Sequence, residues 1–505
     1  MKAPVNGVRI REDLWKLRRW DDTLLWYSRA VAEMWKRRLD DPTGWRYQAA
    51  IHGYRSDNVF LQQLAKPGDR VPANQADVWN QCQHGSWYFL PWHRGYLGCF
   101  EAIVRETIRA LGGPADKWAL PFWNYSDTTN PFARLVRPEF LEPTHPDGTP
   151  NALFQNVRRA PFTARSTPLG TAGDFGLDAL EVRLDALDQR SYSNPPNVPS
   201  FGGGVTGFSH GGAQGTTGRL EASPHGDVHM AVGFDPKTNQ GFWMGGFNTA
   251  GLDPLFWLHH CNLDRLWDVW IAKPRSNPAD PRWLKPSSPV TGQKMPFILH
   301  MPGKPNFTFV PGDMVNAARS VFAYRYDGLA SPPARGLAMA APAPRVTAVD
   351  ETPPTLIGAT TGPVDLDGGR ANASVSLRGL RKASSNRRGL AAGPAPRIFL
   401  SIENIVSEGP SLPYRVYLNV PENFDPDDHI DNFVGTLPMF GVRDATREDG
   451  THGGSGLSYV FDVTDVVKKL GVDASATPLD VAFVPKGGES APAELKVGKI
   501  SFYQR

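Results

Sequence analysis

The segment at residues 253–265 reads Asp253-Pro-Leu-Phe-Trp-Leu-His-His-Cys-Asn-Leu-Asp-Arg265. Aspartate is a preferred N-cap residue and proline suits the first helical position, so the pattern predicts a helix from Pro254 to Trp270. In that helix Asp264 follows His260 by four residues, which predicts that its carboxylate lies beside the His260 ring or backbone and fixes the ring's orientation. We therefore expect His260 to be a metal ligand, whereas its neighbour His259 fits a core or supporting role as well as a direct one.

A second pair of histidines precedes this helix. Ser223-Pro224 again joins an N-cap residue to a proline, which predicts the start of a helix that carries His225 and His229. Residues four apart on a helix point to the same side, so both imidazoles can bind one metal. The H-x-x-x-H pattern alone is a weak indicator, because two helix histidines more often face solvent or core. A zinc protease is disfavoured, since Gly226 stands where such enzymes need a glutamate base.

Three further histidines lie upstream, at His52, His84 and His93. On one unbroken helix His84 and His93 would lie on opposite faces. Pro91 interrupts the run between them, and because proline favours the first position of a helix it predicts a helix start with His93 in the first turn. His84 would then belong to the preceding loop, and His52, at the end of an earlier predicted helix, would complete a trio.

The two groups together hold seven of the chain's twelve histidines. Neutral imidazole is a preferred ligand of copper, zinc, iron and nickel, and three imidazoles leave a metal with an open face. The residues therefore predict a pair of metal ions, with copper as the leading interpretation.

Composition disfavours several other classes. The 505 residues exceed a usual single domain, which predicts one large and one smaller domain. The net charge of +3 gives no support to nucleic-acid or polybasic membrane binding. No secretory signal and no stretch of ~20 apolar residues is found, so a cytoplasmic location without membrane association is expected. Three cysteines, Cys82, Cys99 and Cys261, argue against a disulfide framework. The oligomeric state is open, and a homo-oligomer is one option.

The character of the chain changes after Tyr326. Before it, Asp21 or Asp22 is the predicted N-cap of an amphipathic helix. After it, Ala330 to Arg345 and Lys382 to Pro396 are rich in Ala, Pro, Gly and Arg, as linkers and exposed loops are. Short apolar or alternating runs separated by turn residues follow at Ile398 to Ile402, Tyr414 to Val420, Tyr459 to Val463, Leu479 to Val484 and Ile500 to Tyr503. They predict a β-rich domain of sandwich type.

The motifs resemble those of the coupled binuclear (type 3) copper proteins, namely tyrosinases, catechol oxidases or polyphenol oxidases, and molluscan-type haemocyanins. The resemblance spans roughly residues 5 to 326 and is carried by Cys82-Gln-His84-Gly-Ser-Trp-Tyr-Phe-Leu-Pro-Trp-His93-Arg, Leu120-Pro-Phe-Trp-Asn-Tyr-Ser, Pro224-His-Gly-Asp-Val-His229 and the segment 253–265. It implies a mainly α catalytic domain whose central four-helix bundle supplies three histidines to each of two copper ions. The first copper would be held by His52, His84 and His93, and the second by His225, His229 and His260.

The resemblance also implies roles for four other residues. Cys82 matches the cysteine that, in fungal and molluscan members, forms a thioether with the histidine that stands here at His84. Phe247 matches the aromatic gate over the first copper of plant catechol oxidases, and Glu221 the carboxylate that positions a water near the substrate phenol. Members that hydroxylate monophenols well often have Asn where this chain has Gly226. A glycine has no side chain to polarise that water, which argues against strong monophenolase activity.

The C-terminal region resembles the shielding domain of latent plant and bacterial polyphenol oxidases, which inserts a side chain over the copper pair. We expect a catalytic domain at residues 1–327, a linker at 328–349 and a β-rich shielding domain at 350–505. Leu412, in a loop before a predicted strand, is the candidate for the inserted side chain. Tyr324-Arg-Tyr326 resembles the Y-x-Y motif that closes the catalytic domain, with Arg9 as its expected tether.

The expected activity is that of a dicopper oxidoreductase that uses O2 to oxidise small o-diphenols to o-quinones. Ortho-hydroxylation of monophenols such as tyrosine is a second candidate activity. An oxygen-binding protein like haemocyanin would use the same ligands without turnover, and a zinc hydrolase would not respond to O2. Only the oxidase would form a quinone from a catechol. The oxygen carrier would bind O2 without turnover, and the zinc hydrolase would do neither.

Overall fold

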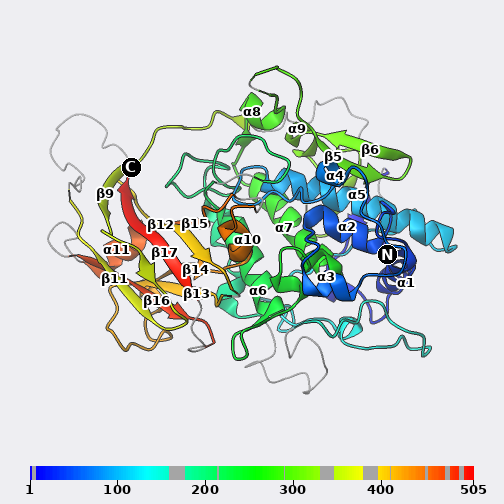
Figure 1. The fold of residues 1–505 in the computed structure, drawn as a ribbon, viewed down its shortest axis with the longest axis horizontal. Helices are drawn as coiled ribbons and strands as arrows, with labels where there is room; N and C mark the ends of the chain where they lie inside the picture. The colour runs from blue at the N-terminus through cyan, green and yellow to red at the C-terminus, as the bar shows by residue number, and fades with distance from the viewer. Residues whose placement is uncertain are drawn as a thin grey trace.

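The computed structural model places a helical region, blue to green, beside a β-rich region, yellow to red (Figure 1). It describes residues 1–2, 7–158, 177–212, 215–288, 290–329, 346–378, 396–409, 411–449, 453–471, 478–487 and 494–505. Most of the expected linker and loop segments, at 330–345 and 379–395, lie outside these residues.

The helical region is built on four helices that carry four of the six predicted ligands, α2 (Trp45–His52), α5 (Phe89–Ala110), α6 (Asp227–Gly233) and α7 (Pro254–Ala272). The long helix α1 (Asp22–Lys36) packs on α5. Their apolar faces share one core, in which Trp45, Trp92 and Trp257 are fully buried, and removing such rings from water is a large favourable contribution to folding. Shorter helices surround them: α3 (Val59–Gln63), α4 (Gln75–Val78), α8 (Pro281–Leu284) and α9 (Pro311–Met314). No helix among the described residues is both long enough and apolar enough to cross a bilayer.

The helix starts follow the predicted capping residues with two changes. Asp21 caps α1 and Asp253 caps α7, each by accepting a hydrogen bond from the backbone N–H two residues ahead. Helix α5 begins at Phe89 rather than Pro91, because the first turn leaves its N–H groups without intrahelical partners and tolerates a proline. Ser223 is extended, with φ −140° and ψ 127°, inside a helical turn at 221–226 that runs into α6. The predicted start there is thus a bend within a longer helical segment.

The β-rich region is a sandwich of two sheets. One has the strand order β10-β17-β12-β15, with β9 also paired to β17, and the other has the order β11-β16-β13-β14. The bounds are β9 (Thr355–Ala359), β10 (Val364–Asp365), β11 (Ala371–Val375), β12 (Ile398–Ser407), β13 (Tyr414–Leu418), β14 (Phe433–Leu437), β15 (Leu457–Asp462), β16 (Leu479–Pro485) and β17 (Leu495–Gln504), with helices α10 (Val442–Thr446) and α11 (Thr464–Leu470) between strands. The five predicted runs lie in β12, β13, β15, β16 and β17, which confirms the β-rich prediction. The prediction did not name the other four: β10 has only two residues, and β9, β11 and β14 contain glycine, alanine or asparagine, which are depleted in strands.

The N-terminus is tied to the end of the helical region. Strand β1 (Arg9–Arg11) pairs in parallel with β7 (Tyr324–Tyr326). The Arg9 guanidinium donates to the Phe322 backbone oxygen and to Glu101 of α5. Arg9 therefore does fasten the strand that contains the Y-x-Y motif, although through the backbone rather than through the tyrosines. Minor strands complete the region: β2 (Phe234–Asp235), β3 (Gln240–Gly241), β4 (Asn277–Pro278), β5 (Phe297–Met301), β6 (Lys304–Phe309) and β8 (Val346–Thr347).

An ion pair between Arg46 of α2 and Asp69 gives a pH-dependent contribution to stability. Burial alone would raise the pKa of Asp69, but hydrogen bonds from Arg46 and from two backbone N–H groups lower it from 3.8 to about 2. A pKa that is lower in the folded state contributes stability above the unfolded value, and this is lost as the pH falls through the folded value. We expect Asp69→Asn to lower Tm by a few degrees at neutral pH, with a difference from the parent that shrinks between pH ~4 and ~2. Thermal unfolding followed by circular dichroism measures this, and a constant difference down to pH ~2 would contradict the assignment.

Candidate metal centre

Four of the six predicted ligand histidines are oriented by backbone carbonyl groups. The Nδ1 atoms of His52, His93, His225 and His229 lie 2.9, 2.7, 3.0 and 2.7 Å from the carbonyl oxygens of Phe247, Phe89, Glu221 and Met244. A carbonyl only accepts, so in the neutral ring Nδ1 carries the proton and the Nε2 lone pair is left for another partner.

The structure brings all six histidines together in the interior. One group contains His52, Cys82, His84 and His93, the other contains His225, His229, His259 and His260, and within each group the ligand atoms lie within 4.8 Å of one another. The two groups adjoin, because the rings of His93 and His260 stack with centroids 4.5 Å apart and those of His84 and His225 are 5.3 Å apart.

Burial keeps these rings neutral. It lowers the pKa of His52 to about 4 and holds the pKa values of His93, His225, His229 and His260 well below their usual range. The neutral ring is the form that binds a metal. The Nε2 atoms of His52 and His225 are buried without a hydrogen-bond partner, which costs free energy unless something else binds them. Two ions that favour nitrogen ligands, such as copper, fit this set of donors.

The two adjacent histidines of α7 take different places. The Nε2 atom of His260 lies 3.3 Å from Nε2 of His229, and its ring stacks on that of His93, so His260 faces both groups. The Nδ1 atom of His259 instead lies 3.1 Å from the Tyr125 hydroxyl. His259 also belongs to the second group, and its Nε2 atom is buried without a hydrogen-bond partner. The choice of His260 as the ligand therefore stays a prediction.

Cys82 lies inside the first group as a buried cysteine outside any disulfide. Its Sγ atom is 3.4 Å from Nε2 of His93, and burial raises the pKa of the thiol well above its usual range. The thioether to His84 stays a prediction, and the intact mass of the protein tests it, because forming the bond removes two hydrogen atoms.

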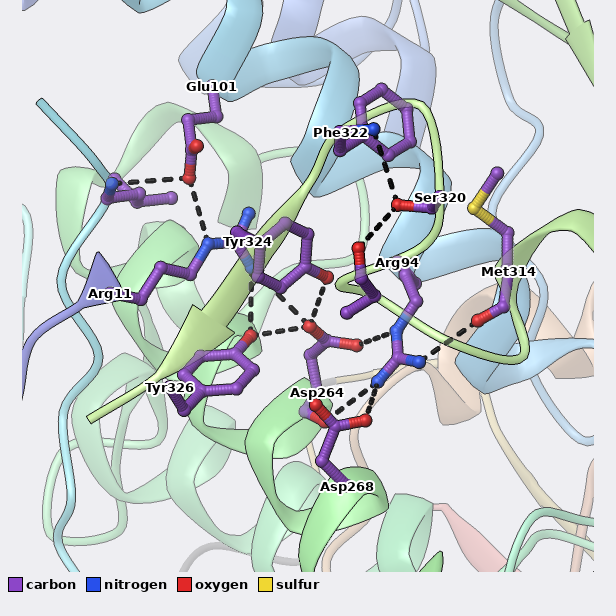
Figure 2. Close-up of polar contacts among 12 residues, drawn as sticks. Arg11, Arg94, Glu101, Asp264, Asp268, Met314, Ser320, Phe322, Tyr324 and Tyr326 are labelled. Carbon is purple, nitrogen blue, oxygen red and sulfur yellow. Dashed lines mark hydrogen bonds and ion pairs between the residues drawn. The ribbon is translucent and has the colours of Figure 1, made fainter. Parts of the chain in front are cut away.

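The predicted contact between Asp264 and His260 is wrong. The Asp264 carboxylate binds the Arg94 guanidinium and accepts hydrogen bonds from the hydroxyls of Tyr324 and Tyr326, each at 2.5 Å (Figure 2). A spacing of four puts two side chains on one face of a helix, but a buried carboxylate turns to the strongest donors within reach, here the guanidinium groups of Arg94 and Arg11 and two hydroxyls. Asp264 therefore ties α7 to α5 and to strand β7.

A small cavity of about 20 Å³ lies at the histidines and is lined by residues of both regions. The helical region contributes His84, Thr217, Glu221, His225, Gly226 and Phe247, and the β-rich region contributes Pro438, Phe440, Gly441, Leu457 and Tyr459. Because one water needs about 10–15 Å³ of such space, the cavity has no room for an aromatic ring.

Phe440, not Leu412, is the side chain that the β-rich region places over the histidines. The Phe440 ring stacks on His229 with centroids 4.0 Å and planes 15° apart, and its centroid lies 5.5 Å from that of His225. Leu412 is buried in the hydrophobic core and does not line the cavity. Phe440 and Leu412 both lie in proline-containing loops next to strands. The sequence does not indicate which of the two loops contacts the histidines.

Three residues of the cavity wall have defined surroundings. Glu221 accepts a hydrogen bond from the Gly85 N–H at 2.8 Å, and burial raises its pKa to about 8. The Phe247 ring centroid lies 4.8 Å from that of His52. A Cβ atom at Gly226 would lie 2.6 Å from Cγ of Pro438. The glycine therefore lets the β-rich region approach the histidines.

Two buried groups with three and four histidines on a helical scaffold, beside a carboxylate and an aromatic wall, define a binuclear metal centre suited to oxidation chemistry. The family model for the common central domain of tyrosinase matches residues 42–273, and one for a domain of unknown function (DUF7868) matches residues 353–505. Tyrosinase HcTyr1 of Hahella sp. (strain CCB-MM4) is 34% identical over 515 residues, which cover 98% of this chain and 99% of the relative. The chain belongs to the tyrosinase family.

Other relatives agree with this assignment. Chloroplastic catechol oxidase B of Solanum tuberosum is 29% identical over 51% of this chain and 40% of its own length. Latent apple tyrosinase shares the fold with a TM-score of 0.64 at 22% identity, covering 99% of this chain and 98% of that one. Latent aurone synthase has a TM-score of 0.61 at 20% identity, covering 100% and 90%. The chain is a copper-dependent oxidoreductase of the phenol oxidase type, with a binuclear copper centre and O2 as co-substrate.

Proposed function

We propose that this chain is a latent phenol oxidase that oxidises o-diphenols to o-quinones and hydroxylates monophenols only weakly. The observation that carries the proposal is the cavity at the six histidines, which Glu221 and Phe247 line beside the ligands. When bound, the copper pair supplies the redox chemistry that couples the reduction of O2 to the oxidation of the phenol. The residues of the chain must then place the phenol, take its proton and control access.

Glu221 is the residue that we expect to take the phenolic proton. Its Oε1 atom is held by the Gly85 N–H, whereas Oε2 is buried without a hydrogen-bond partner. Burial raises the pKa of Glu221 to about 8, so its carboxylate, once ionised, is a stronger base than one in water. It can accept the proton directly or through one water. Phe247 would give the substrate ring an aromatic wall on the side of His52.

The β-rich region is proposed to make the uncut chain less active than the cut one. Because Phe440 lies against His229 and the remaining cavity has no room for a phenol, a substrate can bind only after this region moves or is removed. We expect a chain cut between residues 327 and 396 to oxidise a small catechol faster than the uncut chain. Initial rates of quinone formation by the two forms measure this, and equal rates would contradict shielding.

The experiment that tests the proposed activity compares tyrosine with its catechol analogue on copper-loaded protein, before and after limited proteolysis. We expect quinone formation from the catechol, faster after cutting, and slow turnover of tyrosine. An oxygen carrier would instead bind O2 reversibly without turnover. A cut, copper-loaded protein that leaves the catechol unoxidised would contradict the proposal.

Gly226→Asn is expected to change the substrate preference. In the cut enzyme, an amide beside Glu221 can polarise a water, and we expect the ratio of tyrosine to catechol turnover to rise about tenfold, which corresponds to about 1.4 kcal/mol in the barrier. Gly226→Ala is the matched control, because it adds the same Cβ atom against Pro438 without an amide. Both variants should reduce latency in the uncut chain, but only the asparagine should change the ratio. The same ratio in both variants would exclude the amide effect.

A further inference from the structure

A second cavity, of about 120 Å³, lies between α2 and α3 and shares no lining residue with the cavity at the histidines. Its buried wall includes Ala49, Ala50 and Gly53, while Gln62 and Ala65 on its rim are exposed to solvent. A small molecule can therefore enter it from solvent while the chain stays folded.

The size and the lining of this second cavity fit one monocyclic aromatic molecule. An apolar protein cavity of about 150 Å³ binds benzene, and this cavity, somewhat smaller at about 120 Å³, gains space because its rim is open to solvent. Here Leu39, Leu61 and Leu64 add apolar surface to that of the two alanines. Sites for small ligands typically combine such a lining with a few polar groups that fix orientation.

Arg46 supplies the polar group. Its two terminal nitrogens bind Asp69, and one of them also donates to the Leu64 backbone oxygen. Its Nε–H, in contrast, is buried without a hydrogen-bond partner, which costs free energy that an acceptor oxygen would recover. Because Asp69 already neutralises the guanidinium, a neutral oxygen such as a phenol hydroxyl suits this donor better than a carboxylate, whose charge would be desolvated without a free counter-ion.

We propose that this cavity is a second binding site for a small neutral phenol, separate from the copper centre. The bound ring would contact Asn248, whose side-chain amide donates to the Asp444 carboxylate of α10 at 3.1 Å. The site therefore adjoins a contact between the helical and β-rich regions. It requires neither copper nor turnover, so it does not depend on the proposed oxidase activity.

The uncut, copper-loaded chain under argon isolates this site, because the cavity at the histidines is too small for a ring. We expect 4-fluorophenol, followed by fluorine NMR, to bind saturably to one site per chain. Ala50→Leu fills the buried wall and Ala65→Phe covers the exposed rim, and each should weaken binding about tenfold or more. Ala110→Phe, at the exposed end of α5, is the matched control and should bind like the parent. If the leucine variant fails to fold, the rim variant still decides the question.

Two related probes test the chemistry of the site. Fluorobenzene lacks the oxygen and is expected to bind about fivefold more weakly than 4-fluorophenol. We expect 4-fluorobenzoate to bind more weakly as well, because of its charge. The site would be overturned if the uncut chain bound no 4-fluorophenol, or if both cavity variants bound it like the parent. Tighter binding of the benzoate would overturn the choice of a neutral ligand. None of these readouts involves oxidation, so failure here is distinguishable from failure of the proposed function.

Discussion

Replacing Phe440 with glycine is expected to raise the oxidation of 4-methylcatechol by the uncut chain about tenfold or more. A site that is open in only a fraction of the molecules has an apparent affinity that is lower in proportion to that fraction. In the closed chain the Phe440 ring occupies the space above His229, so few molecules are open to substrate. Removing the ring leaves room for a substrate without moving the β-rich region. The measurement is kcat/KM of uncut parent and variant, each with two copper ions per chain.

Two other variants make this prediction specific. Phe440→Leu keeps an apolar side chain of similar reach and should stay largely latent. Leu412→Ala removes a buried side chain from the core without touching the cavity, so it should lower stability by about 2–5 kcal/mol while leaving the chain latent. If Leu412→Ala activates the enzyme as strongly as Phe440→Gly, activation comes from a loosened β-rich region and not from the loss of a plug.

Replacing His260 with alanine is expected to remove almost all activity from the cut enzyme, about a thousandfold or more in kcat, or about 4 kcal/mol in the barrier. His260 contacts His229 and His93, one from each histidine group, so its loss leaves an incomplete ligand set. Copper content should fall from two ions per chain to about one, which elemental analysis measures.

The neighbouring residue provides the matched control. His259→Ala removes an equally buried imidazole from the same helix, but one whose Nδ1 atom faces the Tyr125 hydroxyl. It should keep two copper ions and most of its turnover, with a loss of stability of about 1–3 kcal/mol because the substitution removes a buried hydrogen-bond partner. A reversed pattern, with copper lost from His259→Ala and kept in His260→Ala, would exchange the roles of the two residues.

Local rules in the sequence predicted much of the fold and the histidine groups. Asp21 and Asp253 cap helices because a short acceptor before a helix satisfies a free backbone N–H, and this depends on neighbours within one turn. The alternating runs of the β-rich region are similarly local. Most of the histidines could be predicted because they lie in or next to helices whose starts or ends are marked in the sequence, where spacing along the chain fixes direction in space.

The two failures at the site concern contacts between distant segments. Asp264 was assigned to His260 from helical spacing, but Arg94 and the two tyrosines of β7 reach it from other parts of the chain. Phe440 was missed because its role exists only once the two regions pack together. Helix α5 begins two residues before the predicted start at Pro91, because the first turn of a helix accepts proline at more than one position.

The carbonyl groups that hold four of the ligand rings have a consequence for how this protein can change over time. Every amino acid carries the same carbonyl oxygen, so a substitution at Phe247 or Met244 exchanges a side chain but cannot delete the atom that orients His52 or His229. Mutation at these positions therefore leaves the orientation of the two histidine rings unchanged as long as the backbone keeps its path. Residues around the centre are free to diversify and adjust substrate choice while the ions stay where they are.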